Sequence, residues 1–230
     1  MKNGLWLLPS RGRPHALAKF MTAAIKHGVS TPGWVLIHES ERELYEPVPL
    51  APGWKLKVTQ THGMGDKFRE IWPMVRNVDW LGWVVDDVVP MTDNWDTTLI
   101  GGLNGANVIS CNDGARAPWR MCCPVFSGDL LRAVGYIYAP GFHHTYMDDA
   151  WEQIGVATGC WWVCMDVTLK HEDAFQTGRE DATHKLSYGR NAEDQATYHA
   201  WRQNGMDAAV IAVFDLMKPV NEKIKEVAYG

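Results

Sequence analysis

Residues 82–90 read Gly-Trp-Val-Val-Asp-Asp-Val-Val-Pro, a short apolar run that ends in two adjacent carboxylates and a turn signal. Such a run is typical of a buried strand, and we predict one over residues 83–86. The strand would carry Asp86 and Asp87 to its carboxyl end, where paired carboxylates can hold a hard divalent cation. Because the chain has no Gly-Lys-Ser/Thr phosphate loop, that cation would be its means of holding a phosphorylated substrate.

Strands and helices alternate around this run, which is typical of a mainly parallel sheet with helices on both faces. The predicted strands cover residues 5–8, 34–38, 55–59, 83–86, 108–111, 124–126 and 161–169. The predicted helices cover residues 14–27, 66–75, 95–101, 130–134, 148–157, 192–203 and 206–225. We therefore predict one α/β domain over residues 1–175, with a helical C-terminal extension over residues 176–230 packed on it.

The composition excludes some function classes. A net charge of −5 lacks the basic excess of a general nucleic-acid binder. The five cysteines are odd in number and lack Cys-x-x-Cys spacing, which favours reduced, buried thiols over a zinc site at Cys160 and Cys164. The first apolar stretch is too short for a signal peptide, and no run reaches the roughly 18–20 apolar residues of a membrane span. We expect a cytoplasmic protein that does not contact a membrane.

Polar side chains follow several predicted strands directly. They are Ser10, Arg11, Arg13, Glu39, Asp86, Asp87, His171 and Glu172. Ligands of open α/β sheets bind beyond the carboxyl ends of the strands, and carboxylates with one imidazole suit Mg²⁺ or Mn²⁺. Each residue taken alone has an ordinary explanation as a loop, turn or cap residue. The joint pattern favours a metal-dependent site at one edge of the sheet.

Two further features point to chemistry. Asp148 and Asp149 open a predicted helix, and Asp149-x-x-Glu152 has capping-box spacing; alternatively, one of the two acids is a general base. The second feature is the aromatic loop, residues 135–146, which is either a hydrophobic lid or a platform for a sugar or a base.

Several motifs together resemble the GT-A class of nucleotide-sugar-dependent glycosyltransferases, specifically its compact family-two-like enzymes. They are Leu8-Pro-Ser-Arg-Gly-Arg-Pro14, Val35-Leu-Ile-His-Glu39, Gly63-Met-Gly-Asp-Lys67, Val85-Asp-Asp87, Pro124-Val-Phe-Ser-Gly128, Tyr146-Met-Asp-Asp149 and Val167-Thr-Leu-Lys-His171. The resemblance runs from Leu7 to about Phe175. It implies a Rossmann-like GT-A domain. The chain departs from the class in having Asp86-Asp87-Val88 in place of a strict Asp-x-Asp motif, and Met147 before Asp148.

The resemblance also implies roles for individual residues. The metal, Mn²⁺ or Mg²⁺, would be bound by Asp87 with Asp86 and His171 assisting. The catalytic base would be Asp148, with Asp149 as the alternative. The nucleotide sugar, expected to be a UDP-sugar, would contact Pro9, Ser10, Arg11, Arg13, Glu39, Gly65, Lys67 and Asp86. The acceptor would contact Ser127, Tyr138, His143, His144 and Tyr146.

The resemblance to small stand-alone bacteriophage transferases implies an inverting enzyme of the host cytoplasm whose acceptor is a hydroxymethylated pyrimidine in DNA. Arg179, Lys185, Arg190 and Arg202 would then contact phosphates. A surface glycan or a small molecule is the alternative acceptor. Two other classes stay open: a nucleotidyltransferase, and a non-catalytic module that binds sugar nucleotides.

Overall fold

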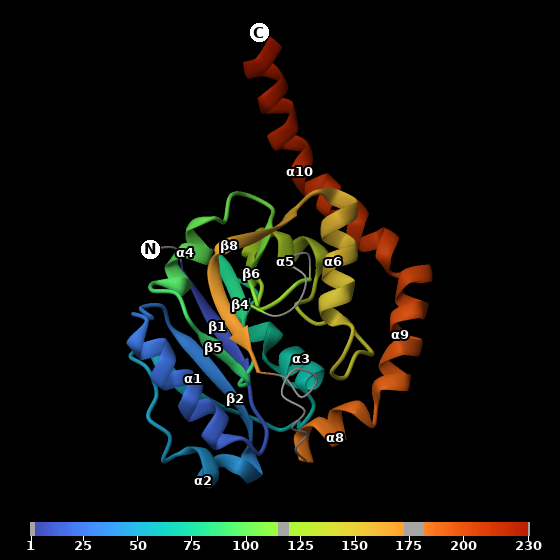
Figure 1. The fold of residues 1–230 in the computed structure, drawn as a ribbon. Helices are drawn as coiled ribbons and strands as arrows, with labels where there is room; N and C mark the ends of the chain where they lie inside the picture. Colours follow the sequence, from blue (N-terminus) through green and yellow to red (C-terminus); the bar gives the residue numbers. More distant parts are fainter. Residues whose placement is uncertain (1–2, 115–119, 173–181, 230) are drawn as a thin grey trace.

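The computed structural model describes residues 3–114, 120–172 and 182–229, and Figure 1 shows one sheet with helices on both sides. The expected α/β class is confirmed. The sheet order is β3-β2-β1-β4-β7-β6-β8-β5. Its strands are β1 (Gly4–Pro9), β2 (Gly33–His38), β3 (Trp54–Thr59), β4 (Trp80–Trp83), β5 (Val88–Pro90), β6 (Val108–Asn112), β7 (Val125–Ser127) and β8 (Trp161–His171).

The sheet is parallel over its first half and mixed over its second. β1 pairs in parallel with β2 and β4, β2 with β3, and β6 with β8. β7 runs antiparallel to both of its neighbours, and β5 runs antiparallel to β8. The parallel half follows from the helical crossovers that join its strands, since only a crossover connection can return the chain in the same direction.

The helices pack on the two faces of the sheet and form a separate hydrophobic core on each face. The helices are α1 (Pro14–Lys26), η1 (Glu39–Glu41), α2 (Arg42–Tyr45), α3 (Met64–Val75), α4 (Trp95–Gly101), α5 (Gly128–Val134), α6 (Met147–Thr158), α8 (Ala182–Tyr188), α9 (Asn191–Asn204) and α10 (Met206–Tyr229). Leu5 and Leu7 of β1 pack in the core under α3, α5 and α6, while Trp6 and Leu8 pack in the core under α1 and α4. This alternation is expected of a strand buried on both faces.

The strand expected over residues 83–86 is displaced. β4 ends at Trp83, and Asp86 and Asp87 form the turn between β4 and β5. The prediction took Pro90 as a turn signal, but Pro90 ends β5, where proline is tolerated at the edge of a sheet. β5 pairs with β8 in a register that sets Val88 opposite His171. This pairing brings the end of β8 to the turn that carries the two aspartates.

The C-terminal helices lie against the body of the molecule. α9 runs beside α6, and α10 passes over α5 and α6 before its end projects beyond the body (Figure 1). Ala209 and Val213 of α10 belong to the core beneath α3, α5 and α6. The boundary placed near residue 175 lies outside the described residues, so the division into domain and extension stays a prediction. No helix among the described residues is long and apolar enough to cross a membrane.

Candidate functional site

A cavity of about 370 Å³ opens beyond the carboxyl end of β1 and beside the β4–β5 turn. Its wall includes thirteen of the residues singled out from the sequence: Pro9, Ser10, Arg11, Arg13, Lys67, Asp86, Asp87, Tyr138, His144, Tyr146, Asp148, Asp149 and His171. They come from both halves of the chain. The cavity therefore brings the two aspartate pairs, Asp86-Asp87 and Asp148-Asp149, to the wall of one space.

Asp86 is held by a chain of hydrogen bonds. Arg13 N donates to the Tyr45 hydroxyl (2.9 Å), which lies 2.7 Å from Ser10 Oγ, and Ser10 Oγ donates to Asp86 Oδ2 (2.5 Å). Arg13 also forms an ion pair with Asp86 Oδ1 at 3.3 Å. Burial raises the pKa of Asp86, the charge of Asp87 raises it further, and Arg13 opposes both. Asp86 is therefore directed at the β1 loop, and its orientation is fixed.

Asp87 has a different set of partners. His171 Nε2 lies 3.2 Å from Asp87 Oδ1, and Arg13 lies 3.3 Å from Asp87 Oδ2. Burial acts to raise the pKa of Asp87, but the hydrogen bond from His171 and the positive charges of His171 and Arg13 outweigh it, so the pKa is lowered. The Asp87 carboxylate is therefore favoured in its ionised form, beside an imidazole. This is a suitable donor pair for a divalent ion.

Lys67 is a buried cation under the same loop. Its Nζ donates to the carbonyl oxygens of Ser10 (2.7 Å) and Leu36 (3.0 Å), so it joins the ends of β1 and β2. Burial lowers the pKa of Lys67 to about 8. These contacts give Lys67 a structural role whether or not it also touches a ligand.

Asp148 and Asp149 lie in the first turn of α6. The N-cap residue is Tyr146, and its side chain makes no capping hydrogen bond, so the capping-box interpretation of Asp149 and Glu152 is wrong. Arg120 Nη2 instead donates to Asp149 Oδ1 at 2.8 Å. Glu152 accepts a hydrogen bond from Met121 N. Asp149 therefore forms an ion pair. Asp148 and Asp149 both line the cavity.

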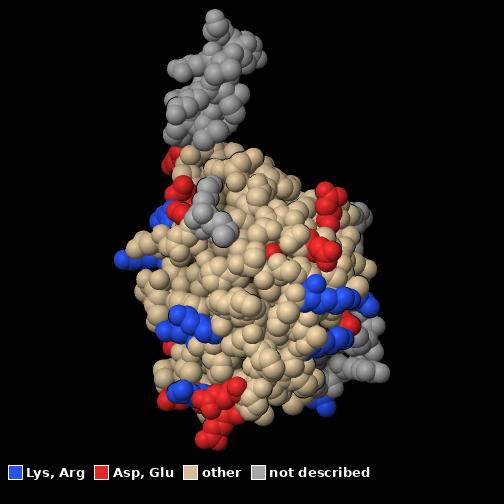
Figure 2. Space-filling model, turned by 90° about the vertical axis from the view of Figure 1, so that its left-hand side faces the viewer, with Lys and Arg blue, Asp and Glu red and all other residues tan. Residues whose placement is uncertain are grey.

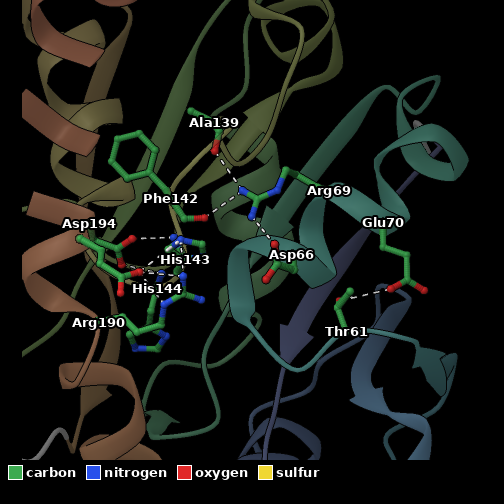
Figure 3. Close-up of polar contacts among 11 residues, drawn as sticks. Thr61, Asp66, Arg69, Glu70, Ala139, Phe142, His143, His144, Arg190 and Asp194 are labelled. Atoms are coloured by element: carbon green, nitrogen blue, oxygen red, sulfur yellow. Dashed lines mark hydrogen bonds and ion pairs between the residues drawn. The ribbon is translucent and has the colours of Figure 1, made fainter. Parts of the chain in front are cut away.

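Charged side chains of α3 and α9 hydrogen-bond to the aromatic loop from two sides (Figure 3). Arg69 of α3 donates to the carbonyl oxygens of Ala139 (3.1 Å) and Phe142 (2.8 Å). Asp194 of α9, which is fully buried, accepts from the backbone N–H groups of residues 143–145 at 2.7–2.8 Å and from the Thr145 hydroxyl at 3.1 Å. These N–H bonds lower the pKa of Asp194 although burial opposes them. The loop is therefore fixed by charged side chains.

Four residues assigned to ligands lie elsewhere. Ser127 caps α5 through Leu130 N, and because β7 is antiparallel to β4, Ser127 pairs with Trp80 at the opposite edge of the sheet. Gly65 packs against the aromatic loop, where a Cβ atom would lie 2.2 Å from the Phe142 carbonyl oxygen. His143 directs its ring to Arg190 (2.7 Å). Glu39 is exposed and accepts a hydrogen bond from Gln60 at 3.1 Å.

The sequence interpretation missed other residues of the wall. His62 lines the cavity and stacks on His38, with ring centroids 3.5 Å apart. Burial and the charge of His38 lower the pKa of His62. His62 follows β3 by three residues, so the strand-end rule could have identified it. Arg120, Cys122 and Cys123 also line the cavity, and no local signal marked them.

No protein-family model matches the sequence, and neither does any curated protein. Solved structures do match the fold. One is a mannosyltransferase from Pyrobaculum calidifontis in complex with GDP-Man and Mn²⁺, with a TM-score of 0.55 and 11% identity over 100% of this chain and 76% of that one. Another is mannosyl-3-phosphoglycerate synthase from Rubrobacter xylanophilus, with a TM-score of 0.57 and 14% identity over 89% and 75% of the chains. At these identities the likeness establishes a GT-A-like fold.

Proposed function

We propose that this chain is a metal-dependent glycosyltransferase that moves a sugar from a nucleotide-sugar donor to an acceptor hydroxyl. The observation that carries the proposal is one cavity in a GT-A-like fold, lined by Asp86-Asp87 with His171 and also by Asp148-Asp149. A cation site and a candidate base in the same cavity are what group transfer between a diphosphate donor and a hydroxyl requires.

The metal would be Mn²⁺ or Mg²⁺, held by Asp87 and His171. Carboxylate oxygens with one imidazole suit these ions, and the two groups already lie 3.2 Å apart. When bound, the ion would stabilise the charge that develops on the departing diphosphate. Asp86 is engaged by Ser10 and Arg13, which favours a contact with the sugar or ribose over direct ligation. The mannosyltransferase from Pyrobaculum calidifontis contains Mn²⁺, which supports a divalent ion here.

The donor would lie along the β1 loop. Ser10, Arg11 and Arg13 line the cavity, and guanidinium groups pair well with diphosphate oxygens. His62, stacked on His38, offers a flat surface for the nucleobase. We expect a UDP-sugar from the resemblance, and the GDP-Man bound by the Pyrobaculum calidifontis protein makes GDP-mannose the first alternative.

Asp148 is the preferred base. The resemblance favours Asp148 for this role, with Asp149 as the alternative, and Arg120 forms an ion pair with Asp149. Asp148 lines the same cavity and would take the proton of the acceptor hydroxyl. A direct in-line displacement would invert the anomeric configuration.

The acceptor would lie against Tyr138, His144 and Tyr146, which line the cavity on the side of the aromatic loop. Support for a DNA acceptor is weak among the described residues. Arg190 is paired with Glu193 at 2.7 Å, and Arg202 lies over the Tyr198 ring. Arg179 lies outside the described residues. On the face drawn in Figure 2, Lys and Arg form small separate groups and no continuous basic patch.

A donor screen tests the proposal. Calorimetry with UDP- and GDP-sugars, with Mn²⁺ and then with EDTA, should find one donor whose affinity depends on the metal. The Asp87→Ala variant should lose that dependence while its far-ultraviolet circular dichroism in EDTA matches that of the parent. The best donor is then offered hydroxymethylated DNA, oligosaccharides and small alcohols, with products read by mass spectrometry. Metal-independent binding of every donor, or release of pyrophosphate in place of sugar transfer, would contradict the proposal.

A further inference from the structure

Three cysteine side chains converge beside the cavity. Cys111 belongs to β6, and Cys122 and Cys123 lie in the segment before β7. All three are buried free thiols whose sulfur atoms lie within 4.8 Å of one another, and the sulfurs of Cys122 and Cys123 are 3.6 Å apart. Zn–S bonds of about 2.3 Å in a tetrahedron place the sulfurs roughly 3.8 Å apart. The three thiols are therefore close to the spacing of a metal-bound set.

The backbone is shaped to bring two consecutive side chains together. Successive side chains of an extended segment point to opposite faces, but Cys123 has a φ of +43°, in the left-handed region that non-glycine residues rarely adopt. Cys111 N donates to the Cys122 carbonyl oxygen at 3.2 Å, and Val85 N–H donates to the Cys123 sulfur. Backbone strain of this kind is concentrated at ligand-binding sites.

An ion can reach the thiols from the cavity, because Cys122 and Cys123 form part of its wall. Cys122 also belongs to a second group with Asp113 and His171, whose ligand atoms all lie within 4.8 Å of one another. A carboxylate and an imidazole therefore lie near the Cys122 sulfur.

We propose that Cys111, Cys122 and Cys123 bind one thiophilic divalent cation, with Zn²⁺ as the physiological ion. The three thiols release their protons to solvent on binding, and no oxidation is involved. Soft thiolates select this class of ion, whereas Asp87 and His171 suit Mn²⁺ or Mg²⁺. The ion would join β6 to residues 120–124 and so hold Arg120, which pairs with Asp149. The proposal does not depend on glycosyl transfer.

Titration with Co²⁺ under reducing conditions, in excess Mn²⁺, is the direct test. Co²⁺ bound by thiolates gives an intense near-ultraviolet charge-transfer band that a carboxylate–imidazole site cannot give. We expect one equivalent of Co²⁺ to saturate the band, one equivalent of Zn²⁺ to abolish it, and Zn²⁺ to raise the unfolding temperature. The Asp87→Ala variant should keep the band, because that residue belongs to the other metal site.

Cysteine variants locate the site. Cys111→Ala, Cys122→Ala and Cys123→Gly should each weaken Zn²⁺ binding more than about tenfold; glycine suits the positive φ of Cys123, so this variant removes the thiol without adding strain. Cys160→Ala and Cys164→Ala are controls outside the cluster and should bind like the parent. The proposal is overturned if the parent shows no charge-transfer band, or if the band survives all three cluster substitutions.

Discussion

Asp86 and Asp87 are adjacent, yet their surroundings give them different chemistry. Asp86 accepts from Ser10 and is buried deeply enough for its pKa to rise, whereas His171 and Arg13 hold the pKa of Asp87 down. A group that remains ionised beside an imidazole suits a cation, and a fixed hydrogen-bonded group suits a sugar or ribose hydroxyl.

The pair Asp148-Asp149 leads to a prediction for the base, because the resemblance favours Asp148 for that role. Asp148→Asn should lower kcat by about 10²–10⁴-fold, the range usual for loss of a general base. Asp149→Asn should lower kcat much less, because it removes an ion pair and no proton acceptor. Steady-state kinetics with saturating donor and metal measure both effects, and circular dichroism checks the fold. A larger loss in Asp149→Asn than in Asp148→Asn would exchange the two roles.

Lys67 leads to a prediction for pH dependence. Its folded pKa is about 8, below the usual 10.5, so between these values the unfolded chain binds more protons and stability rises with pH. Below pH 8 the folded state carries the full free-energy cost of burying the charged Lys67 amine. This cost decreases as the pH rises toward 10.5. The shift corresponds to roughly 3 kcal/mol.

Denaturant unfolding of the parent and of Lys67→Met at pH 7.5 and pH 10 isolates this effect, since other groups titrate alike in both. Between these two pH values the parent should gain about 2 kcal/mol on the variant. The variant should be less stable at both pH values, because the Ser10 and Leu36 carbonyl groups lose their donor. A difference that does not change with pH would contradict the assigned pKa.

The rule that ligands bind beyond the carboxyl ends of strands identified several residues of the cavity wall from the sequence alone. Ser10, Arg13, Asp86, Asp87 and His171 all line the cavity, because ligands gather at the carboxyl edge of parallel strands. The rule failed for Glu39, which follows β2 but is exposed and does not line the cavity. The resemblance assigned Ser127 to the acceptor, but β7 is antiparallel to β4, and strand direction leaves no local signal in the sequence. No sequence pattern indicated the role of Asp194, because its hydrogen-bond donors are backbone N–H groups of a loop about fifty residues away.

At the scale of elements, α9 positions a loop of the candidate site. Asp194 binds the backbone of residues 143–145, and Tyr198, one turn further along α9, stacks on Tyr146 with ring centroids 5.4 Å apart. Tyr146 has a positive φ of 66° and is the N-cap of the helix that carries Asp148. The position of the candidate base therefore depends on a helix that showed no family signature in the sequence.

Removal of the Asp194 carboxylate should therefore affect stability and the acceptor together. Asp194→Ala should lower the free energy of unfolding by about 2–4 kcal/mol, because several N–H groups lose a charged acceptor. It should also raise KM for the acceptor and lower kcat, with little change in donor affinity. The effects of Asp194→Asn on stability and kinetics should lie between those of the parent and those of Asp194→Ala. Gln195→Ala, at the exposed neighbouring position on α9, is the matched control. Equal loss of donor and acceptor affinity would indicate general unfolding and no specific positioning.

Element boundaries were predictable where the local pattern was strong. The helix expected over residues 95–101 is α4 to the residue, and α1 differs by one residue at its end. β4 was misplaced because Val84 and Val85 extend the apolar run beyond its last residue, although Val84 N–H still donates to the Leu7 carbonyl oxygen of β1. β5 has only three residues and depends on β8 for its hydrogen bonds, so no sequence pattern could distinguish it from a turn.

At the scale of the whole molecule, the C-terminal helices share a core with the sheet. Val213 of α10 is fully buried in the cluster that contains Trp151 and Phe126, and α10 packs on both α5 and α6. Helices that bury apolar side chains in a common core unfold together with it. A folding unit that ends near residue 175 would leave this surface of α5 and α6 exposed to water.

Val213 tests this cooperativity. Val213→Ala should lower the free energy of unfolding by about 1–2 kcal/mol, and Val213→Asp by more, because a charge would enter an apolar core. Phe214→Ala, the adjacent but 44% exposed residue, should change it by less than about 0.5 kcal/mol. Tryptophan fluorescence and far-ultraviolet circular dichroism should report one coincident transition in each variant, because Trp151 and α10 share the core. Separate transitions, with Val213→Asp affecting only the one that reports the C-terminal helices, would instead show an independently folded extension.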